Sequence, residues 1–134
     1  SFHEALTLAS IIERETRADE EKVTIASVFY NRIAEGMRLQ TDPTVQYALG
    51  FDENEQTWWK TQLTEADLQV VSPYNTYLYA GLPPGPIANP SLTSLEAVAY
   101  PAQTPYFYFR AKCDGSGTHA FSVTYQEHLN NACP

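Results

Sequence analysis

The first sixteen residues constrain the fold most strongly, because they predict an amphipathic helix whose apolar face has to be buried against the rest of the chain. Ser1 and Glu4 stand at capping-box spacing at the start of this helix. Apolar side chains then recur every three or four residues, the spacing of one helix face, at Ala5, Leu8, Ile11 and Ile12.

Glu15 continues this apolar stripe, which is an unusual place for a carboxylate. A partly desolvated carboxyl group holds its proton to higher pH, as a general acid at neutral pH must. Glu13 falls toward the flank of the stripe and Arg14 points away from it. The alternative interpretation of Glu15 is an ordinary last-turn glutamate paired with Arg14 or Arg17.

The balance of charges excludes some classes of partner. The 134 residues include 16 acidic and 8 basic side chains, a net charge of −8, and the basic side chains form no cluster. A phosphate-binding surface and a nucleic-acid partner are therefore not expected. No apolar stretch is long enough to span a bilayer, and these residues contain no signal peptide. The length fits one domain with a substantial core.

Several kinds of catalytic or metal site are also excluded. The two cysteines and three histidines offer no zinc-site spacing, so no metal is expected. No GxSxG elbow, phosphate-binding Gly-rich loop or HExxH motif is present, and no lysine or cysteine has the context of a nucleophile. Cys113 and Cys133 can form one disulfide in an oxidising compartment, although the sequence does not establish that they are close. A carboxylate remains the best catalytic candidate.

Capping residues and prolines predict further short helices. Asp19 is expected to cap a helix over residues 20–35, and Asp42 to cap one over 43–49 that ends at Gly50. Thr64 with Asp67, Asn89-Pro90 and Thr124 with Glu127 indicate three more. Two strands, 106–111 and 118–122, flank a hairpin turn at 114–117. The fold class is therefore α+β: a mostly helical single domain with a small antiparallel β element and a Pro/Gly-rich irregular loop.

That irregular loop covers residues 72–77 and 81–90, where prolines fix backbone angles without regular hydrogen bonds. Its tyrosine, asparagine and threonine side chains can stack on and hydrogen-bond to a polar ligand. A rigid connector is the alternative, and a polyproline ligand for another protein is less well supported, because the prolines alternate with glycines and apolar residues.

Five sequence blocks resemble the MltG (YceG-like) endolytic murein transglycosylases. The match runs in order from about Thr7 to His128, nearly the whole chain, and the set is specific although each block alone is weak. The blocks are Leu8-Ala-Ser-Ile-Ile-Glu-Arg-Glu-Thr16, Leu39-Gln-Thr-Asp-Pro-Thr44, Tyr74-Asn-Thr-Tyr77, Gly81-Leu-Pro-Pro-Gly-Pro-Ile87 and His119-Ala-Phe-Ser122.

The resemblance implies non-hydrolytic cleavage of the MurNAc-β-1,4-GlcNAc bond of peptidoglycan strands, leaving 1,6-anhydro-MurNAc ends. Such enzymes work with one glutamate, commonly in a Glu-Ser pair at a helix end, which Glu15-Thr16 resembles. Glu15 is thus the expected acid and base, and Glu13 is the competing assignment. No cofactor is expected: family members have also been labelled aminodeoxychorismate lyases, but no site for pyridoxal phosphate is evident.

Substrate-binding residues are expected mainly in the matching blocks: Gln40, Asp42, Thr44, Tyr74, Asn75, Tyr77 and His119. For Asp42 the alternative is its helix-cap role, for Asn75 and Tyr77 loop stabilisation, and for His119 a structural place in its strand. Trp58 and Trp59 either stack on sugars or pack internally.

The resemblance also carries expectations about the whole protein. Residues 1–134 are expected to be one catalytic domain excised from a longer, membrane-anchored protein at the extracytoplasmic face of the bacterial inner membrane, soluble as a fragment. Peptidoglycan strands, and the cell-wall synthesis machinery, are the expected partners. The rival functions are a glycoside hydrolase on the same glycan, with Asp42 or Glu13 assisting water, and a non-catalytic peptidoglycan-binding module.

Overall fold

A computed structural model describes all 134 residues and confirms the α+β class. Its only sheet is two-stranded, and its longest helices come from the first quarter of the chain. The helices are α1 (Phe2–Glu15), α2 (Lys22–Ala34), α3 (Asp42–Leu49), α4 (Leu92–Ala99) and α5 (Tyr125–Asn130), with short 3-10 helices at Asp19–Glu21 and Asp67–Gln69; the strands are β1 (Tyr108–Ala111) and β2 (His119–Ser122).

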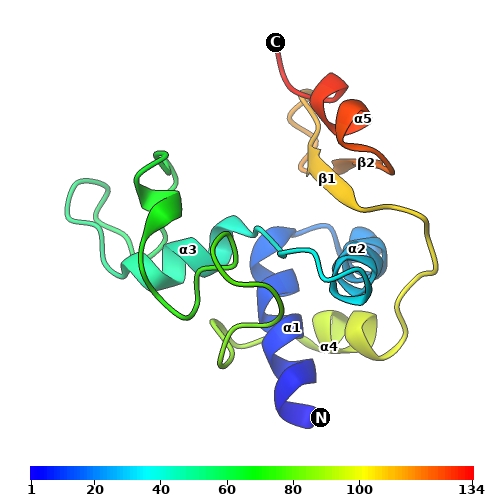
Figure 1. Ribbon diagram of the computed structural model, residues 1–134, viewed down its shortest axis with the longest axis horizontal. Helices are drawn as coiled ribbons and strands as arrows, with labels where there is room; N and C mark the ends of the chain where they lie inside the picture. The colour runs from blue at the N-terminus through cyan, green and yellow to red at the C-terminus, as the bar shows by residue number, and fades with distance from the viewer.

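Helix α1 forms the centre of the core, as its apolar stripe predicts. The capping box of Ser1 and Glu4 is present, and Leu8, Ile11 and Ile12 are at most 2% exposed. Burying each such side chain stabilises the fold by about 1.5–3 kcal/mol. Helices α2 and α4 pack against α1, chiefly through Ile25, Phe29 and Ala97. Figure 1 shows α1 running through the middle of the molecule beside these two helices.

Three predicted helix caps are wrong. Helix α2 begins after a 3-10 turn, and Asp19 there pairs with Lys22 at 2.9 Å instead of capping. The cap positions of α3 and α4 are Thr41 and Ser91, not Asp42 and Asn89, and neither makes a side-chain cap hydrogen bond. The N–H groups of Thr41 and Ser91 instead donate to Thr76 and Glu13, which are far away in the sequence.

The predicted hairpin is confirmed. Strands β1 and β2 are antiparallel, with Tyr108 opposite Ser122 and Ala111 opposite His119. Helix α5 follows, capped by the Thr124 side chain, and a disulfide joins Cys113 to Cys133. We call β1, β2 and α5 the C-terminal module.

Polar contacts attach the C-terminal module to α2. Asn31 donates to the carbonyl oxygens of Thr104 and Tyr106 at 2.9 and 2.8 Å, and Arg32 Nε donates to that of Phe107 at 2.6 Å. Because these bonds hold the segment leading into β1, they set the position of the whole module relative to the helices.

The region between α3 and α4 is irregular, as predicted, but it is well anchored. The fully buried Asn75 amide donates to the carbonyl oxygens of Leu68 and Val70, both at 2.9 Å, and the backbone N–H of Ile87 donates to Ser10 of α1 at 3.0 Å. Figure 1 shows this region with α3 on one side of the C-terminal end of α1 and the C-terminal module on the other. No helix has the length and hydropathy needed to cross a membrane.

Candidate active site

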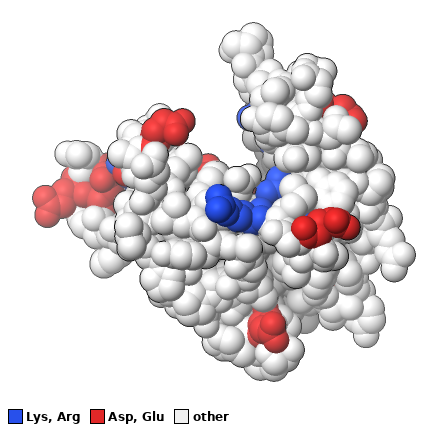
Figure 2. All heavy atoms as spheres, in the orientation of Figure 1, with Lys and Arg blue, Asp and Glu red and all other residues white.

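A cleft of about 520 Å³ opens at the C-terminal end of α1. Figure 2 shows this face hollowed between two raised parts, with Lys and Arg atoms gathered at the hollow. The end of α1, α2, the start of α3, the irregular region and the C-terminal module all contribute to the lining, through Glu15, Phe29, Arg32, Leu39, Gln40, Thr41, Asp42, Tyr77, Tyr108, Phe109, Arg110, Ala111, His119, Tyr125 and His128.

Glu15 is the last residue of α1 and lies half-buried at this cleft. Its carboxyl group accepts no hydrogen bond from the protein and pairs with neither Arg14 nor Arg17, so the last-turn ion pair is absent. Burial, and secondarily the negative charge of Asp42, raise the pKa of Glu15 from 4.5 to about 8. The group can therefore hold a proton at neutral pH without losing access to a ligand.

Asp42 and Tyr77 form the closest polar pair of the cleft. The Tyr77 hydroxyl donates to Asp42 Oδ1 at 2.6 Å. Burial, this hydrogen bond and the charge of Asp42 raise the pKa of Tyr77, so its proton stays in place. The Asp42 carboxylate is thereby held at the cleft instead of capping α3.

Gln40 lies beside this pair on a strained backbone. Its φ is 52°, in the left-handed region that favours glycine. A hydrogen bond from its N–H to the Thr76 carbonyl oxygen, at 3.2 Å, holds it there. The Gln40 side chain makes no hydrogen bond to the protein and lines the cleft, so its amide is available to a ligand.

Thr44 lies below the lining. It is fully buried in a cluster of hydroxyl groups with Thr41 and Thr76, in which the Thr44 and Thr76 oxygens are 2.8 Å apart. The cluster links the start of α3 to the irregular region and so supports Asp42 and Gln40 from behind.

Tyr74 and Asn75 also lie outside the lining. Tyr74 packs against Tyr47, with ring centroids 4.8 Å apart. Besides its amide bonds, Asn75 accepts a hydrogen bond of 2.9 Å from the backbone N–H of Tyr77. Asn75 thus fixes the segment that carries Tyr77, and does not itself reach the cleft.

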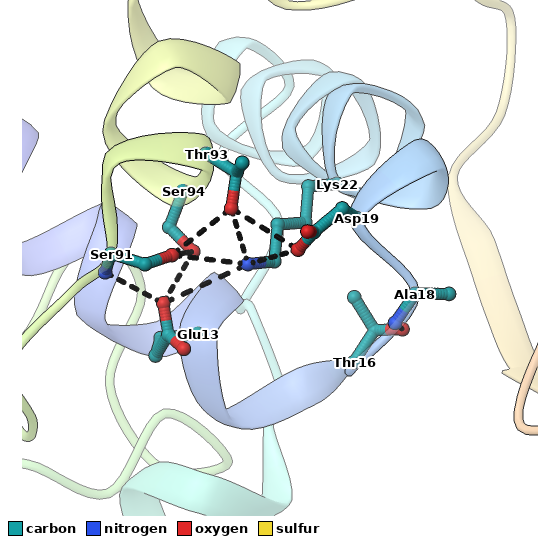
Figure 3. Close-up of polar contacts among 8 residues, drawn as sticks. All are labelled: Glu13, Thr16, Ala18, Asp19, Lys22, Ser91, Thr93 and Ser94. Atoms are coloured by element: carbon teal, nitrogen blue, oxygen red, sulfur yellow. Dashed lines mark hydrogen bonds and ion pairs between the residues drawn. The ribbon is translucent and has the colours of Figure 1, made fainter.

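Glu13 faces a different part of the surface from Glu15. Figure 3 shows it among side chains of α2 and α4, where the Ser91 N–H and the Ser94 hydroxyl each donate to it at 2.8 Å and Lys22 lies 3.7 Å away. Partial burial alone would raise the pKa of Glu13, but these hydrogen bonds and the Lys22 charge outweigh it and lower that pKa to about 2. Glu13 is ionised and joins three helices.

His119 does line the cleft, held from behind by a carboxylate. Glu21 accepts hydrogen bonds from both the backbone N–H and ring Nδ1 of His119, each at 2.7 Å. The ring Nε2 has no protein partner.

The two tryptophans differ: Trp59 packs under the Arg14 guanidinium at 3.9 Å, whereas Trp58 is 65% exposed and lies against Phe51, outside the cleft.

Apart from His119, sequence reasoning missed the cleft residues of α2 and of the C-terminal module. Arg32 carries the same signal that identified Glu15, since it continues the apolar stripe of Ile25 and Phe29 at helical spacing. Tyr108 and Arg110 alternate with Phe109, which is partly buried and packs against the core, and this alternation places both on one face of a strand. Tyr125 and His128 carried no such signal.

No group of three or more His, Cys, Asp or Glu residues is arranged to hold a metal ion.

Comparisons with known proteins agree along almost the whole chain. Residues 1–133 match the model of the YceG-like family. An endolytic murein transglycosylase of Bacillus subtilis (strain 168) is 47% identical over 128 residues, and one of Streptococcus pneumoniae serotype 2 (strain D39) is 37% identical over 111 residues. The crystal structure of a yceG-like protein from Listeria monocytogenes superposes with a TM-score of 0.86 at 48% identity, over 97% of this chain and 40% of that one.

These relatives are much longer than the chain. The matches cover 96% and 83% of this chain but only 33% of the Bacillus protein and 20% of the Streptococcus protein.

Proposed function

The chain belongs to the YceG-like family, and on that premise we propose that it is the catalytic domain of an endolytic lytic transglycosylase acting on peptidoglycan. The names of the Bacillus and Streptococcus relatives support a murein transglycosylase. The single observation that carries the chemistry is Glu15, a carboxyl group at a cleft whose raised pKa keeps it protonated near neutral pH.

In this proposal Glu15 acts twice at the MurNAc-β-1,4-GlcNAc bond. It first donates its proton to the glycosidic oxygen, which leaves with the GlcNAc unit as positive charge builds on the muramyl ring. The resulting carboxylate then takes the proton of the muramyl 6-hydroxyl as that oxygen bonds to C1. The product end is 1,6-anhydro-MurNAc, Glu15 is protonated again, and no water is consumed.

Protonation before the reaction is the main requirement. With a pKa of about 8, roughly nine Glu15 groups in ten carry their proton at pH 7. At its ordinary pKa of 4.5 the group would almost always be ionised. Glu13, whose pKa is about 2, is a poor proton donor at that pH.

Asp42 supports the same step through its charge. A carboxylate near Glu15 raises the pKa of Glu15 and also favours the positive charge that develops on the sugar. Tyr77 fixes Asp42 by its hydrogen bond of 2.6 Å, while Gln40 and His119 offer unpaired polar groups for acetamido and hydroxyl groups of the substrate.

A glycoside hydrolase is the second candidate, because Asp42 supplies a second carboxylate in the same cleft. In that reaction Asp42 would take a proton from an attacking water, and the product would have a reducing end. The two functions thus differ in the product formed and not in the site.

We also propose a localisation and partners for the domain. We place the domain outside the cytoplasm, attached to the membrane through other parts of a longer protein and acting near the cell-wall synthesis machinery. The disulfide between Cys113 and Cys133 supports an oxidising compartment.

The test is mass spectrometry of purified glycan strands incubated with the protein, with Glu15→Gln and with Glu13→Gln as the matched control. Anhydro-muramyl ends from the wild type and from Glu13→Gln, and none from Glu15→Gln, are expected. Reducing ends would establish the hydrolase. Full activity in Glu15→Gln would overturn the assignment of Glu15, and binding without cleavage by the wild type would indicate a binding module.

A further inference from the structure

Two arginines in the cleft lack an acidic partner, although the chain has twice as many acidic as basic residues. The ion pairs of the structure involve the N-terminus, Lys22, Lys60 and His119, and none involves an arginine. Arg32 and Arg110 both line the cleft. Since no arginine of the chain is paired, what distinguishes Arg32 and Arg110 is their shared place at one cavity, where an anion from outside can reach both.

Arg32 is the more unusual of the two, because it is only 7% exposed. Its Nε donates to the Phe107 carbonyl oxygen at 2.6 Å and its Nη1 to that of Arg38 at 2.8 Å. Nη2 makes no hydrogen bond. The only buried side-chain polar atom without a hydrogen-bond partner is Ser122 Oγ, so Arg32 Nη2 must be in contact with solvent. The buried charge is thus offset by carbonyl dipoles and by the ring of Tyr108, with no carboxylate in an ion pair, and one nitrogen remains open to a ligand.

Arg110 lies on the side of the cleft formed by Arg32, Tyr108 and His128, where Tyr108 is the link between the two arginines. Arg110 shares a face of β1 with Tyr108, whose ring centroid is 4.9 Å from Arg32 Cζ. Arg110 Nη1 donates to the His128 carbonyl oxygen at 3.1 Å, which leaves its other nitrogens free.

Arg32 and Arg110 both lie close enough to the His128 ring for their charges to act on it. The ring stacks on Tyr108 at 5.2 Å, and burial together with the charges of Arg110 and Arg32 lowers the pKa of His128. Glu15 and Asp42 also line the cleft, but neither makes an ion pair with Arg32 or Arg110, and the Asp42 carboxylate is held by Tyr77.

We propose that Arg32 and Arg110 form an anion-binding pair that recognises a carboxylate of the muramyl unit in the cleft. A planar guanidinium matches a carboxylate through paired N–H donors, and such charge-assisted bonds are the strong ones. Of the two sugars of the strand, only the muramyl unit carries a lactyl ether. Its carboxylate is free on naked strands and is amide-linked where a stem peptide, with carboxylates of its own, is attached.

The identity of this ligand rests on the proposed function, so the test measures binding separately from cleavage. Calorimetry with Glu15→Gln, which leaves strands intact, compares three ligands: naked strands, naked strands whose lactyl carboxylates are converted to methylamides, and peptide-bearing strands. We expect naked strands to bind about tenfold or more tightly than their methylamides. If peptide-bearing strands bind as tightly as naked strands, the stem-peptide carboxylates are ligands of the pair. If they bind as weakly as the methylamide strands, the ligand is the lactyl carboxylate.

Substitutions of Arg32 and Arg110 test whether these two residues cause the preference for strands with free carboxylates. Added to Glu15→Gln, either Arg110→Gln or Arg32→Lys should reduce the preference for carboxylate strands, whereas Arg17→Gln, which removes the same charge outside the cleft, should keep it. Arg32→Lys retains the charge but lacks the planar fork, and the Arg110 side chain makes only one hydrogen bond to the protein, so folding is expected to survive in both. Thermal unfolding checks this.

Equal binding of carboxylate and methylamide strands, no binding of any strand, or a preference that persists in both variants would overturn the anion-binding pair. If the wild type cleaves all strands to anhydro ends in that case, the proposed function stands without it. If binding depends on the carboxylate but the wild type cleaves no strand, the anion-binding pair is supported and the proposed transglycosylase activity is rejected.

Discussion

The Tyr77 hydroxyl donates a hydrogen bond of 2.6 Å to Asp42, and the charge of Asp42 in turn raises the pKa of Glu15. These residues come from the irregular region, α3 and α1, so the protonation of one carboxyl group depends on three separate parts of the chain. This relationship makes the pH dependence of activity the most direct probe of the cleft.

Replacing Asp42 with Asn removes a negative charge while keeping the size of the side chain. Burial remains the larger cause of the raised pKa of Glu15, so that pKa should fall toward, but not to, 4.5. We expect the high-pH limb of kcat/KM to move to lower pH and activity at pH 7 to drop. The comparison is Glu96→Gln, an exposed acid on α4, which should leave the profile unchanged. An unshifted limb in Asp42→Asn would show that Asp42 does not act on Glu15.

Glu15 should also make the stability of the fold depend on pH. Its folded-state pKa of about 8 lies above the ordinary 4.5, so the stability it contributes is complete below about pH 4.5 and is lost as pH rises through 8. Glu15→Gln stays neutral and should be more stable than the wild type at pH 9. Partial solvent access reduces the gain to the order of 2 kcal/mol.

Thermal unfolding at pH 5 and pH 9 measures this difference, which should be small at the lower pH. Glu13→Gln is the matched variant and should behave differently. Its ionised carboxylate accepts two hydrogen bonds and has a pKa of about 2, so its contribution is present at both pH values and is lost only in acid. A stabilised Glu13→Gln, or a Glu15→Gln that is less stable at pH 9, would contradict these roles.

Gln40→Gly separates backbone strain from function. Glycine accepts a φ of 52° without a steric penalty, so stability should change by less than about 1 kcal/mol, while loss of the amide at the cleft should raise KM several-fold. Gln56 has a φ of 53° and does not line the cleft, which makes Gln56→Gly the matched control. Denaturant unfolding and kinetics of both variants give the comparison. Equal KM values in the two would remove Gln40 from substrate binding.

Reducing the disulfide should loosen the wall of the cleft that carries Arg110. The bond between Cys113 and Cys133 closes a loop across 20 residues, for which about 3 kcal/mol of stabilisation is expected. The Cys113→Ser, Cys133→Ser double variant should therefore unfold at lower temperature and bind strands more weakly. Mass measurement after alkylation without a reductant checks that the bond forms, and two alkylated cysteines in the native protein would show that it does not.

The sequence predicts the elements of this fold better than their boundaries or their contacts. Local signals were sufficient for α1, the hairpin and the stiff irregular region, because caps, alternation and prolines act over a few residues. They placed Asp42 and Tyr77 among the cleft residues, but the predicted cap role of Asp42 was wrong, because nothing near it in sequence reveals that Tyr77, 35 residues away, binds its carboxylate. Arg32 was missed for another reason: its place on an apolar stripe was visible, but only the folded chain brings it to the same cleft as Glu15.

The hydrogen bonds from Ser91 and Ser94 to Glu13 join residues 78 and 81 positions apart, and they mark the packing of α4 on α1. Mostly helical domains usually fold fast, because most of their contacts are local. Here the central helix gains its cover only after the long intervening segment has closed into a loop, at an entropic cost that precedes the stabilising contacts. We therefore expect this domain to fold more slowly than its helical content suggests, with α1 exposing an apolar face until α4 arrives.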